Sequence, residues 1–275
     1  MRKTFLFIAL IAASVNSCDD LLGSLSSEAD ATLSGMSPKD SIVTQDVMRH
    51  VVDSTGEYTI DLQLPVIQTG ITESEILEYA SEMLGGTYEG LYTDTAAMAS
   101  HYIGEVTSEY QEMAKEIPNL KEICMSLLCN NKLQKDYESS KFVTYVYTSE
   151  TYSGGVHGGY TIQGQTFRKN DGRRIGWDIL KNTYEQEFQE LLKHGLKEYF
   201  EVGSDDELKS MLLNESDFYS IPLPQCGPMF VKEGISFVYN QYEIAPYAAG
   251  LPSFVVPYDK IKPYLNATGK KLITK

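Results

Sequence analysis

Basic residues are scarce in this 275-residue sequence. It has 23 Lys and Arg against 38 Asp and Glu, which gives a formal net charge of −15 at pH 7. Binding to a phosphate backbone depends on basic side chains, so this balance excludes nucleic acid as a partner. Acidity instead favours salt-sensitive encounter with cationic partners, although an acidic surface that is merely solvated is the alternative.

The sequence also lacks the short motifs of common enzyme classes. It contains no GxSxG nucleophile elbow, no glycine-rich phosphate loop and no HExxH helix. No CxxC motif and no paired Cys and His cluster is present, so a structural zinc site is not expected. We therefore expect no catalytic residue, no metal site and no cofactor, and favour a protein that is not an enzyme.

Cysteine is used only four times, at positions 18, 124, 129 and 226. If Cys18 is modified, the other three leave at least one free thiol. Cys124 and Cys129 would lie on opposite faces of a strand, or about 140° apart on a helix. A bridge between them requires an irregular segment, and we do not expect it.

The first seventeen residues have the pattern of an export signal. Two basic residues precede an apolar run over 5–15, which is shorter than the roughly 20 residues of a membrane-spanning helix. Cys18 follows the small residue Ser17, and this junction resembles a lipobox, with Asn16 in place of the usual small residue. We expect cleavage before Cys18 and a lipid anchor on it; an ordinary secretory signal is the alternative.

The predicted anchor sets the localisation that we expect. An acylated Cys18 would hold the chain to a lipid bilayer, outside the cytoplasm. Asp19 and Asp20 resemble the export signal of Bacteroidetes lipoproteins, which implies the outer membrane or the cell surface. Removal of the signal would leave 21 basic and 38 acidic residues, a net charge of −17.

Four segments are expected along the chain. Residues 1–17 form the signal peptide, and 18–54, rich in Ser, Asp, Ala and Thr, read as a lipid-anchored flexible tether. An N-terminal α+β domain over 55–141 and a C-terminal domain over 142–275 make up the body.

Helical and strand patterns occur in blocks, which favours an α+β fold with antiparallel sheets packed against helices. Capping boxes are predicted at Thr72 with Glu75 and at Ser204 with Glu207. Apolar stripes of helical period predict helices over 72–83, 94–116, 178–200 and 205–213. Alternating or β-branched runs predict strands over 58–65, 142–148, 160–168, 235–239 and 254–257.

Two motifs stand out: Tyr-Ser-Gly-Gly-Val-His-Gly-Gly at 152–159 and Tyr-Asn-Gln-Tyr-Glu-Ile-Ala-Pro-Tyr-Ala-Ala-Gly at 239–250. Their combination resembles the extracytoplasmic C-terminal domain of RsiV-type anti-sigma factors, which also accompanies peptidoglycan and polysaccharide deacetylases. The resemblance covers about 142–265 and implies a smaller N-terminal strand-helix unit coupled to it. Val156 stands where Ala is commoner.

The resemblance also limits the function. We find neither a cytoplasmic sigma-binding segment nor a deacetylase domain with its metal-binding Asp and His, so neither activity is expected of this chain. RsiV is a lysozyme receptor, which implies a cationic protein or a cell-wall glycan as partner. We therefore expect an extracytoplasmic binding module; an enzyme acting on peptidoglycan or polysaccharide, or a structural envelope lipoprotein, are the alternatives.

The two motifs supply the candidate binding residues. Glycines permit close approach and positive φ, histidine titrates near neutrality, and tyrosine offers an apolar ring with a polar tip. Each residue could instead have a structural role: the histidine ring could bond to neighbouring backbone, and the tyrosines and Glu243 could pack and bond inward. An acid–base pair of His157 and Glu243 would require the two side chains to converge in a pocket. The candidates are Gly154, Gly155, His157, Gly158, Tyr242, Glu243 and Tyr247.

Overall fold

The computed structural model describes residues 41–66, 70–117, 119 and 126–274. Within these ranges the chain forms six α-helices and two β-sheets, which confirms the α+β fold. Among the described helices none has both the length and the hydropathy needed to span a bilayer. The predicted lipidation site Cys18 and the thiol of Cys124 lie outside the described residues.

The larger sheet has six strands in sequence order from β1 to β6. All neighbours pair antiparallel except β2 and β3, which are parallel. The expected antiparallel pairing therefore holds for every pair of this sheet except β2 and β3, where two helices carry the chain back to the start of β3. The strands are β1 (Thr44–Val52), β2 (Gly56–Pro65), β3 (Leu127–Glu138), β4 (Phe142–Tyr152), β5 (Gly159–Arg168) and β6 (Arg174–Ile175).

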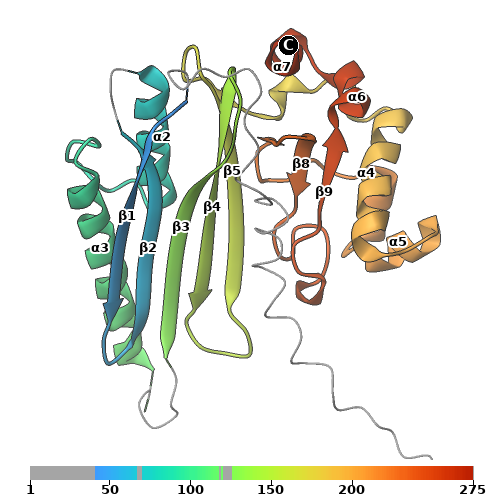
Figure 1. Cartoon of the computed structure of the whole chain (residues 1–275). Coiled ribbons are helices and arrows are strands. Elements are labelled where there is room, and N and C mark those ends of the chain that lie inside the picture. The colour runs from blue at the N-terminus through green and yellow to red at the C-terminus, as the bar shows by residue number, and fades with distance from the viewer. Residues whose placement is uncertain (1–40, 67–69, 118, 120–125, 275) are drawn as a thin grey trace, which may run out of the picture. The chain divides into compact units, whose positions relative to one another are not determined.

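Helices α2 (Ile71–Met83) and α3 (Thr95–Glu116) lie beside β1 and β2 and bury one face of this sheet (Figure 1). Asp94 caps α3 by accepting the N–H of Ala97 at 3.0 Å. The predicted capping box of α2 is wrong. The Thr72 hydroxyl donates instead to the carbonyl of Lys169, at 3.0 Å, and Gly70 is the N-cap.

The second sheet and the remaining helices surround a separate apolar cluster. Helix α4 lies beside β9 (Figure 1), where a side chain added at Gly195 would meet the ring of Phe254. The predicted capping box of Ser204 and Glu207 is present, whereas the helix expected over 178–200 begins only at Gln186. The elements are α4 (Gln186–Phe200), α5 (Asp205–Met211), β7 (Met229–Phe230), β8 (Gly234–Val238), β9 (Ser253–Pro257), α6 (Tyr258–Ile261) and α7 (Ala267–Ile273).

Buried threonines join the two sheets. The hydroxyl of Thr144 donates to the carbonyl of Phe230 at 2.7 Å, and that of Thr166 accepts the N–H of Phe230 at 3.1 Å. Gly164 on β5 leaves room for Met229, whose side chain would lie 2.1 Å from an added Cβ. These contacts position β7 directly against β4 and β5.

The structure differs from the predicted segment boundaries. Residues 44–52, within the predicted tether, form β1. The boundary at 141/142 falls in the turn between β3 and β4, two adjacent strands of one sheet, so it does not separate two sheets. Cys129 and Cys226 are both buried free thiols.

Candidate functional site

The two sequence motifs meet beside the first half of β5. The loop over 153–158 joins β4 to β5, and the segment over 239–250 follows β8. Between them lies an open hollow of about 220 Å³. Its lining residues are His157, Gly158, Gly159, Tyr160, Thr161, Asn240, Gln241, Tyr242 and Tyr247.

Three aromatic rings form one side of this hollow. His157 stacks on Tyr247 with 3.9 Å between ring centroids and 18° between planes. The ring of Tyr242 lies 5.9 Å from that of Tyr247 and 6.5 Å from that of His157. His157 and Tyr242 are exposed and Tyr247 is partly exposed, so this triad presents ring faces and edges to solvent.

Hydrogen bonds orient the imidazole of His157. Its Nδ1 lies 3.1 Å from the carbonyl oxygen of Gly158, which can only accept. Nδ1 therefore carries the proton. In the neutral ring Nε2 is then an acceptor, and it lies 3.4 Å from the hydroxyl of Tyr242.

Tyr242 is held in a left-handed backbone conformation, with φ of 63°. This region is sparsely populated by bulky residues and costs on the order of 1 kcal/mol or more. The cost is offset by the turn that contains it: the N–H of Glu243 donates to the carbonyl of Asn240 at 3.0 Å. The turn aims the ring of Tyr242 at solvent, where it is 55% exposed.

Glu243 supports this turn from behind and does not face the hollow. Its carboxylate accepts the backbone N–H of Asn240 at 2.7 Å and that of Gln225 at 2.5 Å. The polar partners of His157 are Gly158 and Tyr242. The structure therefore does not bring His157 and Glu243 together as an acid–base pair.

The glycines of the first motif have different roles. Gly154 and Gly155 have φ of 102° and 96°, so they form the tip of the β4–β5 loop and do not line the hollow. Gly158 lines it, and an added Cβ there would lie 2.6 Å from the carbonyl oxygen of Thr151. Of the seven predicted binding residues, the hollow unites His157, Gly158, Tyr242 and Tyr247.

The structure adds a feature that the sequence analysis missed, a row of side chains that caps the edge of β5. Gln241 accepts the N–H of Tyr160 at 3.1 Å. Asn240 accepts the N–H of Ile162 at 2.8 Å and donates to its carbonyl at 3.1 Å. Burial raises the pKa of Cys226 to about 12, and the sulfur of this thiol accepts the N–H of Gly164 at 3.1 Å.

This edge capping explains the Asn240-Gln241 pair in the second motif. Side-chain amides substitute for a further strand, because an amide group presents the same donor and acceptor as the backbone. The motif is thereby fixed against β5, and Tyr242 follows directly. In the sequence, the only sign of this edge capping was the polar pair Asn240-Gln241 next to the aromatic residues of the motif.

The chemistry of the hollow suits a neutral or cationic ligand. No Lys, Arg, Asp or Glu lines it. Tyrosine faces stack on apolar faces of sugars and attract cations. The Gln241 amide uses its oxygen on β5, so its N–H groups are available to a ligand. No lysine or arginine is present in this lining to balance the charge of an anion.

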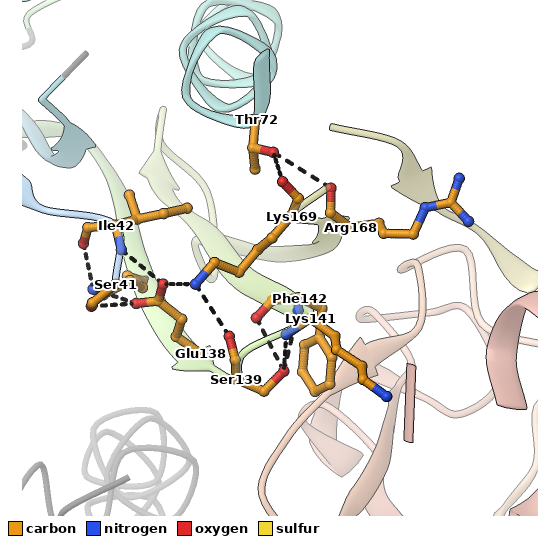
Figure 2. A network of polar contacts seen from close by, with 10 residues as sticks. Ser41, Ile42, Thr72, Glu138, Ser139, Lys141, Phe142, Arg168 and Lys169 are labelled. Carbon is orange, nitrogen blue, oxygen red and sulfur yellow. Dashed lines mark hydrogen bonds and ion pairs between the residues drawn. The ribbon is translucent and has the colours of Figure 1, made fainter. Parts of the chain in front are cut away.

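A second hollow, of about 360 Å³, lies near the start of α2. Figure 2 shows the polar network beside it, where Glu138 lies between Ile42 and Lys169. The Glu138 carboxylate accepts the N–H of Ile42 at 2.8 Å and pairs with Lys169 at 2.7 Å and Lys135 at 3.1 Å. The carboxylate is thus fully paired, and we assign this network to holding the start of the described chain on the sheet.

A metal centre is absent from the part of the chain that the structure describes. There, no three His, Cys, Asp or Glu side chains converge as ligands. Neither hollow therefore offers the donor set that a structural or catalytic cation would need.

Comparison with known proteins identifies a domain in this chain. A family model described as a protein of unknown function, DUF3298, matches residues 177–259. The chain thus carries a DUF3298 domain, which is consistent with the RsiV-like domain expected there. No curated protein is significantly similar to the chain.

Two solved structures share the fold. A DUF3298 family member from Bacteroides fragilis has 20% identity and a TM-score of 0.63, covering 82% of this chain and 94% of that chain. A DUF3298 family protein from Pseudomonas aeruginosa has 12% identity and a TM-score of 0.57, covering 82% and 95%. At these identities the similarity concerns the fold alone.

Proposed function

We propose that this chain is a binding module of the cell envelope, and that the triad of His157, Tyr242 and Tyr247 contacts its partner. The observation that carries the proposal is the exposed triad itself. A strained turn holds Tyr242 at the surface, beside a hollow that no Lys, Arg, Asp or Glu lines. The partner is a cationic protein such as a lysozyme, or a glycan of the cell wall.

Salt dependence distinguishes these two partners. The formal charge of −15 over the chain attracts a cationic protein, and screening weakens that attraction beyond a Debye length of about 8 Å at physiological salt. A neutral glycan would bind through ring stacking and hydrogen bonds, which salt affects little. Titrations of lysozyme and of peptidoglycan fragments at low and high salt therefore assign the partner class.

Replacing Tyr247 with alanine should weaken binding about tenfold. The substitution removes one ring face and the stacking partner of His157, worth about 1–2 kcal/mol of binding free energy. Calorimetric or fluorescence titration of the purified protein with either ligand measures the effect. Tyr184→Ala is the matched control, since Tyr184 is 86% exposed and does not line the hollow. Equal affinities for the two variants would refute the assigned site.

We propose further that Cys18 anchors the protein to a lipid bilayer outside the cytoplasm, at the outer membrane or the cell surface. The support is the basic and apolar pattern that ends at Ser17-Cys18. Cys18→Ala should abolish incorporation of labelled palmitate and release the protein from the membrane fraction. Retention of the label in the variant would show that Cys18 is not the acceptor, and Cys226→Ala is the control.

A further inference from the structure

Strand β1 is the outermost strand of the six-stranded sheet. The N–H of Val66 donates to the carbonyl of Val43, and that of Asp53 to the carbonyl of Gly56. Both pairs continue the register of β1 on β2, and bonded positions alternate along an antiparallel pair. Odd-numbered residues of β1 therefore bond to β2, and the N–H and carbonyl groups of Thr44, Asp46, Met48, His50 and Val52 point away from the sheet.

This edge lacks several of the features that usually block strand pairing, although it carries the charged residues Asp46 and Arg49. β1 is nine residues long and contains neither proline nor lysine, and its register on β2 has no bulge. Met48 is 58% exposed and Val52 is 66% exposed. Of the outward carbonyls, that of Met48 accepts an N–H from the Arg49 side chain. Within the described residues, no other strand pairs with this edge.

We propose that β1 pairs with β1 of a second copy of this chain, antiparallel and about a two-fold axis at Met48. Outward groups of one copy then meet outward groups of the other, as an antiparallel ladder requires. The two six-stranded sheets become one continuous sheet. Pairing by strand addition is a common mode of recognition, and a two-fold interface must be self-complementary.

Side-chain complementarity selects the register. With Met48 opposite Met48 of the copy, Asp46 lies opposite His50 of the copy, twice per dimer. Centring the axis on Asp46 or His50 would instead place like groups opposite each other, which is unfavourable. His50 already contacts Glu57 at 3.0 Å, so in the dimer its ring lies between two carboxylates.

The nearby side chains favour a second copy over an unrelated extended peptide. The exposed face of β1 presents Asp46, Met48 and His50 in this order. When two copies of the strand pair antiparallel, each acid therefore lies opposite a histidine and the two methionines lie opposite each other. Despite a strongly acidic chain, β1 itself carries one acid, one arginine and one histidine. The strand therefore adds little charge repulsion between the two copies.

Disulfide trapping of the whole chain, expressed in intact cells, tests the register. Opposed residues that exchange hydrogen bonds have Cα atoms about 5.5 Å apart, which suits a disulfide. Met48→Cys should therefore form a covalent dimer on a non-reducing gel. His50→Cys should not, because two such residues lie about 14 Å apart in this register. The unmodified chain controls for the native cysteines.

Co-expression of two different cysteine variants tests the register independently. Thr44→Cys and Val52→Cys should cross-link only when the two variants are co-expressed, because Thr44 faces Val52 of the copy. No dimer with Met48→Cys, or equal cross-linking with His50→Cys, overturns the proposal. If the protein is monomeric in these assays, pairing of two copies is refuted, and any partner of the β1 edge must be a different molecule.

Met48→Pro tests the same contact without a new cysteine. Its N–H points outward, so β2 loses no hydrogen bond, and edge strands tolerate proline there. Sedimentation equilibrium should show at least a roughly tenfold weaker dimer, since two N–H donors are lost per dimer. Circular dichroism checks that the variant is folded. An unchanged dimer constant would refute pairing through β1. This inference is independent of the proposed binding site.

Discussion

Replacing Glu138 with alanine should lower the free energy of unfolding by about 3–5 kcal/mol, because it removes the buried carboxylate that pairs with two largely buried lysines. The Glu138 side chain is 4% exposed and its partners Lys169 and Lys135 are 12% and 22% exposed. The variant also frees the N–H of Ile42 (Figure 2). Urea or thermal unfolding of both proteins measures the difference.

The pH dependence of this network has a defined sign. Burial alone would raise the pKa of Glu138, but the hydrogen bonds from Lys169 and Ile42 and the charge of Lys135 outweigh it and lower the pKa below its ordinary value. A lowered pKa in the folded state stabilises the protein above the unfolded pKa of about 4.3. This contribution is lost as pH falls through the folded pKa.

An exposed pair provides the control for Glu138. Glu112 contacts Lys115 one turn away on α3, and both side chains are more than two-thirds exposed. Glu112→Ala should change the unfolding free energy by less than about 0.5 kcal/mol. If Glu138→Ala were equally mild, the network would not stabilise the fold as we describe.

Replacing Asp136 with asparagine should stabilise the protein at neutral pH, by up to about 3 kcal/mol. Asp136 lies at the register shift between Lys135 and Tyr137 in β3, and one of its carboxylate oxygens is buried without a partner. Burial, and then the nearby charge of Glu233, raise the pKa of Asp136 to about 6. Asparagine has no charge to bury.

The size of this gain should depend on pH. The pKa of Asp136 is about 6 in the folded protein and about 3.9 in the unfolded chain, so between these values the folded protein binds the proton more strongly. The wild type therefore loses stability as pH rises from about 4 to 6. Unfolding curves of both proteins at pH 4 and pH 7.5 measure this dependence. The two free energies of unfolding should be nearly equal at pH 4, and that of the variant should be higher at pH 7.5. A pH-independent difference would contradict a charge effect. Glu233→Gln, which keeps the Asp136 carboxylate, should give a smaller gain.

Local patterns in the sequence determined much of the secondary structure. The alternating run over 58–65 lies within β2, and the helix predicted over 94–116 is α3 with its Asp94 cap. The capping box at Ser204 and Glu207 also formed. These signals act between residues at most a few positions apart, so the sequence contains them in full.

Long-range contacts decided the elements that sequence reasoning missed. Thr72 does not cap α2 because its hydroxyl finds the carbonyl of Lys169, 97 residues away. β1 has a mixed polar composition, and it is a strand because β2 pairs with it. The parallel pairing of β2 with β3 depends likewise on how α2 and α3 pack, which no local window contains.

For the candidate site, the sequence supplied the two motifs, and the tertiary structure decided which side chains meet. His157 and Tyr242 are 85 residues apart, and they meet because Asn240 and Gln241 fix the second motif on the edge of β5. Glu243 points away from the hollow, and its carboxylate accepts the backbone N–H groups of Gln225 and Asn240. Which residues share a surface depends on packing and on satisfying buried polar groups, and both are properties of the folded chain.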